Sequence, residues 1–445
     1  MKKIIALLLA MMMVFALGFN ALADEEPVAE EEDIATAPAE MAGKTVILHT
    51  NDVHGAIDGY AYVAALKAED EAKGAEVILV DAGDYSQGTT YVSTTKGADA
   101  IDMMNVTGYD IATLGNHEFD YGYAQLAANM ENAEFEVICA DILDADGAPI
   151  FDANYTYTTE SGLKIGFFGM DTPEAQTKTN PALIQGLKFL VGDELFACAQ
   201  EQADALADAD LVICLAHLGV DAESEPYRST DLAAKVTGID MIIDGHSHTV
   251  MTEGENGEAI QSTGTAVANI GVIVIDDETK AIESNELVAI KDGDGNVVYE
   301  GTPDETVAAA AQVIIDRVKA EYGEVFATSE VTLNGAKAPN GNRDSETNNG
   351  DLICDAMVWQ VMQNKSGLKV ADDMVVAVTN GGGIRAAINP GVVTKQDINT
   401  VLPFGNTVAL VYVTGAELLE LVGVHTLREV IGCVLISVEV EELIH

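Results

Sequence analysis

Positively charged residues are scarce in this chain. Its 445 residues include 22 Lys and Arg against 73 Asp and Glu, which gives a formal net charge of −51. Proteins that bind nucleic-acid polymers neutralise phosphates with clustered Lys and Arg, so this composition argues against such a partner. It does not argue against a small anionic substrate, because bound divalent cations can reverse the local field.

Cysteine is also rare, and its spacing carries no metal motif. No C-x-x-C occurs, and the cysteines number five: Cys139, Cys198, Cys214, Cys354 and Cys433. A thiolate metal site is therefore not expected. Cys139 and Cys214 lie in apolar, strand-like runs, and we interpret them as small buried hydrophobic residues.

Long apolar runs are absent beyond the N-terminus. The run at residues 4–19 follows two lysines and precedes the A-x-A motif at residues 21–23. This order predicts a signal peptide at 1–23 and a secreted or cell-envelope protein, the alternative being an uncleaved membrane anchor. No later run is long enough to span a bilayer, so no transmembrane segment is predicted in the mature chain.

The rest of the chain divides into parts of different composition and periodicity. Apolar strand runs that alternate with helical patterns are typical of an α/β layered domain. We predict an acidic disordered spacer at 24–42, this α/β domain at 43–300, a connector helix within 301–327 and a smaller second domain at 328–445. In the second domain, we expect a helix at 348–362, a strand that ends in a Gly-rich turn within 374–385, and a further strand at 407–415. Pro303 is expected in the first turn of the connector helix.

Polar side chains follow the predicted strands of the first domain. In open α/β sheets the carboxyl ends of strands are where sites assemble. Alternation along a strand also predicts that the first two of these side chains point the same way. The residues at these ends that could hold a metal are Asp52, His54, Asp84, Asn116, His217, His246 and His248.

These seven donors are carboxylates, imidazoles and one amide oxygen. Such a set suits zinc, manganese or iron better than calcium. Seven donors are too many for one tetrahedral ion and suit two ions that share a carboxylate. Any single His, taken alone, is more often a surface or core residue. His49 lies inside a strand, on the face opposite to His54, and we interpret it as structural.

The motifs Asp52-x-His54, Gly-Asp84, Gly-Asn116-His117-Glu, His217 and Gly-His246-x-His248 resemble those of the calcineurin-like metallophosphoesterases. The segments ILHTNDVHG, DAGDYSQGT, LGNHEFDYG, GFFGMDTPE, NGGGIR and LPFGN resemble the secreted 5′-nucleotidase, UDP-sugar hydrolase and 2′,3′-cyclic phosphodiesterase family. The resemblance runs from about residue 44 to 422. It implies a four-layer α/β/β/α sandwich followed by a smaller α/β nucleotide-binding domain.

The resemblance also implies roles for individual residues. One ion would be held by Asp52, His54, Asp84 and His248, and the other by Asp84, Asn116, His217 and His246. His117 would be catalytic, with Asp120 holding its imidazole. The substrate would be bound by Arg343, Arg385, Phe404 and Asn406. Without the resemblance, Phe404 would be interpreted as a core aromatic and Arg343 as a solvated charge.

The implied function is release of phosphate from nucleotides by a hydroxide that bridges two divalent ions, zinc, manganese or similar. Two alternatives stay open: a phosphoesterase for a non-nucleotide ester, and a non-catalytic surface protein that retains the fold. Residues after 422 show no resemblance to the family, whose members continue further. We therefore expect the second domain to be incomplete, in a truncated or frame-shifted chain.

Overall fold

The computed structural model describes residues 40–293, 295–337, 339–363, 365–414 and 417–418. The predicted signal peptide, nearly all of the predicted spacer and the segment after residue 422 lie outside these residues. Within the described part, no helix combines the length and the apolar character needed to cross a membrane.

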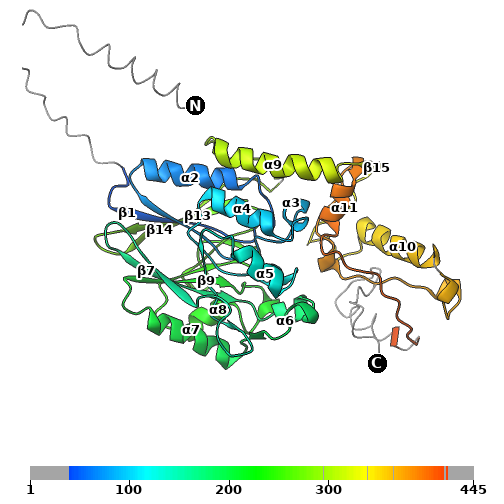
Figure 1. Ribbon diagram of the computed structural model, residues 1–445, viewed down its shortest axis with the longest axis horizontal. Helices are drawn as coiled ribbons and strands as arrows, with labels where there is room; N and C mark the ends of the chain where they lie inside the picture. The colour runs from blue at the N-terminus through cyan, green and yellow to red at the C-terminus, as the bar shows by residue number, and fades with distance from the viewer. Residues whose placement is uncertain (1–39, 294, 338, 364, 415–416, 419–445) are drawn as a thin grey trace, which may run out of the picture. The chain divides into compact units, whose positions relative to one another are not determined.

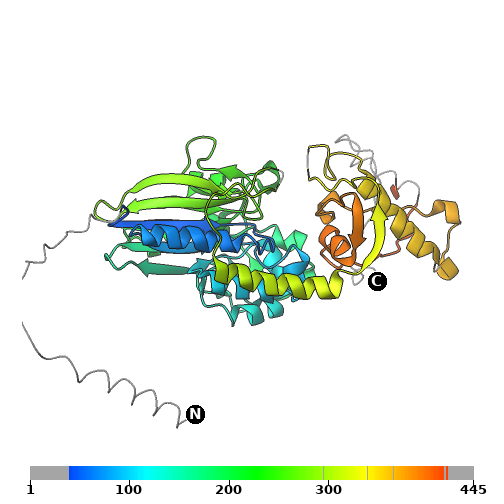
Figure 2. The same cartoon turned by 90° about the horizontal axis from the view of Figure 1, so that it is seen from above.

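The first domain contains two six-stranded mixed sheets (Figures 1 and 2). The first sheet has the order β14-β13-β1-β2-β3-β4. Its strands β1 to β4 run parallel to one another, and β13 and β14 add an antiparallel edge. The strands span β1 Lys44–Thr50, β2 Glu76–Asp81, β3 Ile111–Ala112, β4 Glu136–Val137, β13 Asn269–Asp276 and β14 Ile282–Ala289.

The second sheet has the order β11-β12-β10-β9-β7-β6. Four parallel strands form its centre, and β6 and β11 pair antiparallel at its edges. The strands span β6 Asn154–Thr158, β7 Lys164–Asp171, β9 Leu211–His217, β10 Met241–Asp244, β11 Val250–Met251 and β12 Ile260–Thr263. The apolar run 136–143 forms β4 and β5 (Ile142–Leu143), the latter paired with β8 (Lys188–Phe189), rather than one strand.

Side-chain alternation along the strands builds the layers. Ile47 of β1 faces Phe167 and Ile213 of the second sheet, in a core between the two sheets. Its neighbours Val46 and Leu48 point to the opposite face and pack against helices. That helical layer contains α2 (Tyr60–Ala72), α4 (Ala98–Thr107) and α9 (Glu305–Tyr322).

The outer face of the second sheet is covered in the same way. Phe168, Cys214 and Ala216 pack against α7 (Asp193–Ala205) and α8 (Ser229–Lys235). The result is a helix–sheet–sheet–helix sandwich, as the family resemblance implied (Figure 1). The burial predicted for two cysteines is confirmed, because Cys139 and Cys214 are fully buried. Shorter elements of this domain are α3 Thr90–Ser93, η1 Asn116–Phe119, α5 Tyr123–Met130, α6 Ala175–Lys178, η2 Pro181–Leu183 and η3 Ala222–Ser224.

Helix α9 begins later than the prediction that Pro303 lies in its first turn. Asp304 is the N-cap, and its carboxylate accepts a hydrogen bond from the Val307 amide at 2.8 Å. Pro303 therefore lies before the helix. The buried face follows helical spacing, with Val307, Ala311, Ile314 and Val318. Arg317 forms an ion pair with Asp99 of α4.

The second region is smaller and has little sheet. Strand β15 (Val325–Ser329) pairs antiparallel with β16 (Gly391–Thr394). The predicted helix is present as α10 (Asn348–Gln363), and α11 (Lys395–Val401) follows β16. Three 3-10 turns complete it: η4 Lys365–Gly367, η5 Asp372–Met374 and η6 Gly381–Gly383. Its core contains Ile353, Ile384, Ile388, Val393 and Val401.

The two strands predicted in this region are wrong, but the Gly-rich turn predicted within 374–385 is present as η6. Residues 374–385 contain 3-10 turns and irregular backbone, and the described part of 407–415 has no regular secondary structure. Val376 is 57% exposed and Val413 is 50% exposed, so their apolar side chains do not line a core. An apolar run forms a strand only where a neighbouring strand takes its backbone hydrogen bonds, and these segments have no such ladder in the described part.

Candidate metal centre

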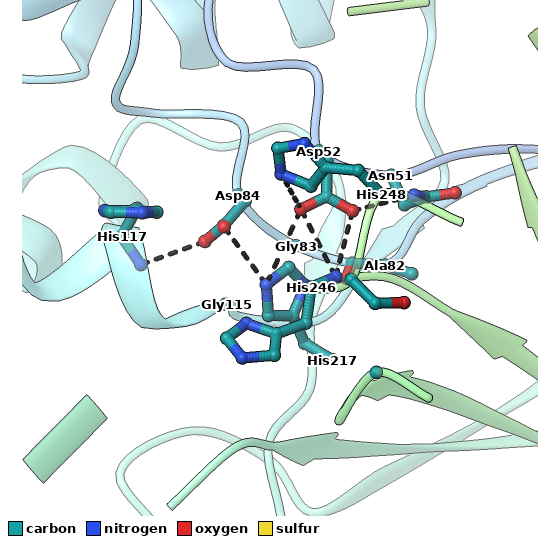
Figure 3. Close-up of polar contacts among 12 residues, drawn as sticks. Asn51, Asp52, Ala82, Gly83, Asp84, Gly115, His117, His217, His246 and His248 are labelled. Atoms are coloured by element: carbon teal, nitrogen blue, oxygen red, sulfur yellow. Dashed lines mark hydrogen bonds and ion pairs between the residues drawn. The ribbon is translucent and has the colours of Figure 1, made fainter. Parts of the chain in front are cut away.

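The loops after the strands bring five predicted ligands together. Figure 3 labels four of them: Asp52, Asp84, His217 and His248. The Asp84 Oδ2 atom lies 3.1 Å from His217 Nε2 and 3.7 Å from His54 Nε2. The Asp52 Oδ1 atom lies 3.3 Å from His248 Nε2. Two groups with metal-ligand spacing result, Asp52–His54–His248 and Asp52–Asp84–His217.

The carboxylates of Asp52 and Asp84 each lie within 4 Å of an imidazole from each of the two groups. Asp52 Oδ1 is 3.8 Å from His54 Nε2 and 3.9 Å from His217 Nε2, and Asp84 Oδ2 is within 4 Å of the same two atoms. The geometry therefore leaves both Asp52 and Asp84 within reach of each set. The resemblance singles out Asp84 as the shared ligand.

The ligands reach these positions through a strained backbone, not through strand alternation. Strand β1 ends at Thr50, before Asp52 and His54. Five candidate ligands lie in the left-handed region: Asp52 (φ 50°), His54 (47°), Asp84 (64°), His246 (71°) and His248 (57°). They are half of the ten non-glycine residues with positive φ in the described part. Strain of about 1–2 kcal/mol per residue, concentrated at one place, is typical of functional sites.

Backbone carbonyls fix the orientation of two imidazoles. His54 Nδ1 lies 3.0 Å from the Gln87 carbonyl oxygen, and His217 Nδ1 lies 2.7 Å from the Ala82 carbonyl oxygen. A carbonyl only accepts hydrogen bonds, so each Nδ1 carries the proton. In the neutral rings, Nε2 then directs a lone pair toward Asp52 and Asp84. His54 Nε2 also lies 3.2 Å from His248 Nε2. This convergence of lone pairs and carboxylate oxygens fits a cation.

Asn116 and His246 lie beside the two groups. The Asn116 Oδ1 atom is buried and has no hydrogen-bond partner among the described residues, which fits an oxygen ligand for an ion. The His246 ring packs edge-on against that of His217, with centroids 5.3 Å apart. Its backbone amide donates to Asp52 Oδ2 at 2.9 Å, and its Nε2 lies 2.9 Å from Glu174 Oε2. Only Nδ1 of this ring is left for an ion.

Electrostatics hold Asp52, Asp84 and His54 in the forms that bind metals. Burial opposes ionisation of Asp52, yet His248 and His217 lower its pKa to about 2. Asp84 is also buried, but His217 and His117 hold its pKa well below the usual range. Burial lowers the pKa of His54 to about 3. Ionised carboxylates and neutral imidazole are the forms that coordinate divalent ions. Burial lowers the pKa of His217, but Asp84 and Asp52 outweigh burial and raise it well above its usual value, so this ring must give up a proton when an ion binds.

His117 lies next to this centre and is held on two sides. Its backbone amide donates to Asp84 Oδ1 at 2.9 Å, and its Nδ1 lies 2.7 Å from Asp120 Oδ2. Burial lowers the pKa of His117, but Asp120 and Asp84 outweigh burial and raise the pKa above its ordinary value. The ring stacks on Phe404, with centroids 5.7 Å apart and planes 24° apart.

The predicted substrate residues are exposed or half-buried. The Arg385 guanidinium lies 5.7 Å from the Phe404 ring centroid. Phe404 is half-buried and is not part of the small core of the second region. The structure therefore brings Arg385 and Phe404 to His117, whereas the side chains of Arg343 and Asn406 are exposed.

Sequence reasoning missed Glu118, which joins two ligand-bearing loops. Its carboxylate is buried and accepts hydrogen bonds from the amides of Asp84 (2.8 Å), Ser86 (3.0 Å) and Gly115 (2.7 Å). An acid inside the motif GNHEFD was a visible signal. Gly115 itself is required, because a Cβ there would lie 2.4 Å from Asp84 Oδ1.

Family models match both regions of the chain. The calcineurin-like phosphoesterase model matches residues 45–250, and the 5′-nucleotidase C-terminal domain model matches residues 325–428. Together with the sandwich and the His/Asp groups, these matches define a metal-dependent phosphoesterase.

Three relatives narrow the class. The chain is 32% identical to the 5′-nucleotidase of Diplobatis ommata over 416 residues, which cover 84% of this chain and 69% of that protein. It is 30% identical to the trifunctional nucleotide phosphoesterase protein YfkN of Bacillus subtilis over 415 residues, 84% of this chain but only 27% of that protein. A snake venom 5′-nucleotidase of Gloydius brevicauda is 28% identical over 419 residues, 84% of this chain and 68% of that protein.

A solved structure agrees with these relatives. The crystal structure of a 5′-nucleotidase precursor from Thermus thermophilus superposes with a TM-score of 0.68 at 25% identity, covering 82% of this chain and 74% of that one. The chain therefore belongs to the 5′-nucleotidase family, with a calcineurin-like phosphoesterase domain and a 5′-nucleotidase C-terminal domain.

Proposed function

We propose that this protein is a secreted phosphohydrolase that releases phosphate from nucleotides with the help of two divalent ions. One observation carries the proposal: His117, paired with Asp120, lies between the candidate ligand Asp84 and the aromatic ring of Phe404. A phosphate at the ions and a base on the aromatic ring would then belong to the same molecule.

The candidate ligands would divide into two sets. Asp52, His54, Asp84 and His248 would hold one ion, and Asp84, Asn116, His217 and His246 would hold the other, as the family resemblance implies. Zinc and manganese both suit these donors. The ions would supply activation of water and neutralisation of phosphoryl charge.

The protein's own residues complete the chemistry. Asp120 accepts from Nδ1 of His117, so Nε2 is the atom that donates toward charge developing on the phosphoryl group or the leaving oxygen. The same carboxylate favours the cationic imidazole. Phe404 stacks on the base, and Arg385 and Arg343 bind the anionic end of the substrate.

Secretion belongs to the same proposal. The two lysines, the apolar run at 4–19 and the A-x-A motif at 21–23 support it. The relative named as a venom enzyme is consistent with export.

Phosphate release from a panel of esters tests the proposal. The panel contains nucleoside 5′-monophosphates, 2′,3′-cyclic nucleotides, a UDP-sugar, a sugar phosphate and an aryl phosphate, each assayed with Mn²⁺ or Zn²⁺ and with a chelator. We expect metal-dependent release, with a kcat/KM for at least one nucleotide that exceeds the aryl phosphate by roughly 10-fold or more, the value of one stacked base.

Other outcomes would contradict different parts of the proposal. Metal-dependent release with equal kcat/KM for nucleotide and aryl phosphate would contradict nucleotide recognition and favour another ester. Absence of release from every ester with either ion would contradict the enzymatic function and favour a non-catalytic protein.

A further inference from the structure

Glu174 contacts the metal centre from outside the ligand set. It follows β7 in the motif GFFGMDTPE and is the residue before α6. Its Oε2 atom lies 2.9 Å from Nε2 of His246 and also forms an ion pair with Lys178. The Glu174 side chain is 16% exposed and that of His246 is 9% exposed, so water competes little for this contact.

This contact determines which nitrogen of His246 can bind an ion. Lys178 is a cation on the same oxygen, so Glu174 is present as a carboxylate and only accepts hydrogen bonds. Nε2 of His246 therefore carries the proton, and the lone pair of the neutral ring is on Nδ1. His54 and His217 have the opposite arrangement, because carbonyls of Gln87 and Ala82 hold their Nδ1 atoms and leave Nε2 inward.

The carboxylate that contacts His246 and the carbonyls that contact His54 and His217 differ in the strength of their hydrogen bonds as well as in position. Hydrogen bonds to a charged acceptor are stronger than those to a neutral carbonyl. A carboxylate on the remote nitrogen also makes an imidazole a more basic ligand. The described part shows a carboxylate on the remote nitrogen of His246, and shows carbonyls on those of His54 and His217.

We propose that Glu174 is a positioning residue that fixes His246 for coordination through Nδ1 and strengthens one of the two ion sites selectively. The inference rests on the two-ion site of the proposed function. Glu174 touches neither ion nor substrate, so its effect passes through His246. The ion bound by His246 should depend on Glu174, and the ion bound by His54 and His248 should not.

Metal titration of the full chain tests this proposal without using activity. The chain is stripped with a chelator and titrated with Mn²⁺, with binding followed by calorimetry and by the electron paramagnetic resonance of free Mn²⁺. The variants are Glu174→Ala, which removes the contact, and Glu174→Gln, which keeps a hydrogen-bond acceptor but removes the charge. The matched control is Glu194→Gln, since Glu194 is also paired with a lysine, Lys188, but both are exposed.

We expect two sites in the native chain and in the control. Glu174→Ala should weaken one site by ~10–100-fold and leave the other within ~3-fold, and Glu174→Gln should fall between Ala and native. Equal weakening of both sites, or native affinity at both, would overturn the proposal. If Glu174→Ala does not fold, Glu174→Gln alone decides, and native affinity there overturns the role of the charge. A native chain that binds no Mn²⁺ or Zn²⁺ would instead contradict the proposed function itself.

Discussion

The candidate functional residues of the two regions differ in burial and in the size of the sheets and cores that carry them. In the first domain, Asp52, Asp84 and His217 are buried beneath loops that leave two six-stranded sheets. In the second region, Arg343 and Asn406 are exposed, and the described residues of this region form one two-stranded sheet and a small core. A catalytic centre needs fixed geometry, which deep cores provide, whereas substrate selection tolerates looser support. We therefore expect the chemical step and the choice of substrate to be separable by mutation.

Replacing His117 gives the largest expected effect of the variants that retain the candidate ligands. His117→Ala removes a donor to developing charge but keeps the backbone amide that binds Asp84, so both ions should stay bound. We expect kcat to fall by about 100–1,000-fold for nucleotides and aryl phosphates alike. Steady-state kinetics together with metal analysis provides the check. A drop in kcat confined to nucleotides would show that His117 acts in substrate selection. It would contradict the assignment of the chemical step to the first domain.

Protonation of His49 should make the free energy of unfolding of the first domain depend on pH. Its buried ring donates to Gln261, and burial lowers its pKa to about 4, against about 6.5 in the unfolded chain. Between these values the unfolded state binds more protons, so folding stability from this group is present above pH 6.5 and is lost as pH falls to 4. The full difference is roughly 3 kcal/mol.

His49→Gln should remove this pH dependence while keeping a polar partner for Gln261. Urea unfolding of the native chain and the variant at about pH 7 and about pH 4, without added metal, measures it. The constant cost of the smaller side chain cancels between the two pH values. We expect the variant to lose roughly 3 kcal/mol less than the native chain on going to the lower pH. Identical losses would show that His49 is not held neutral in the folded core.

Phe404 and Asn406, in the second region, give the smallest expected effects, and these effects should fall on substrate selection. Phe404→Ala should raise KM for a nucleotide by about 10-fold, since stacking of one base contributes about 1–3 kcal/mol. The kcat/KM for an aryl phosphate without a nucleoside should change less than about 3-fold, within the few tenths of a kcal/mol expected away from the contact. Asn406→Ala, with the loss of a single hydrogen bond, should cost the nucleotide less than Phe404→Ala. Equal losses for both substrates would place Phe404 in support of His117.

The sequence was most informative where residues that can bind metals follow the ends of predicted strands. Asp52, Asp84 and His217 could be predicted because each follows an apolar run, and such runs form buried parallel strands. The division of these strands into two sheets was not visible residue by residue, because pairing depends on contacts distant in sequence. It came instead from the resemblance to a known family.

The predictions that were wrong or incomplete have physical causes that cannot be read from local sequence patterns. Residues 374–385 have the composition of a strand but no partner strand in the described part, and composition cannot supply one. The left-handed backbone at Asp52 and His54 arises from tertiary packing that outweighs local preference. Glu174 was within a recognised motif, yet the role that we propose for it depends on contact with His246, 72 residues away.

The most direct test of the shared metal centre is metal content measured together with phosphate release for the native chain and Asp84→Ala. After equilibration with Mn²⁺ and removal of free ion, the native chain should retain two equivalents and hydrolyse a nucleotide. Asp84→Ala should lose at least one equivalent and about 1,000-fold or more in rate, because several kcal/mol of charge stabilisation depend on the ions. A variant that keeps both ions and the native rate would contradict the account.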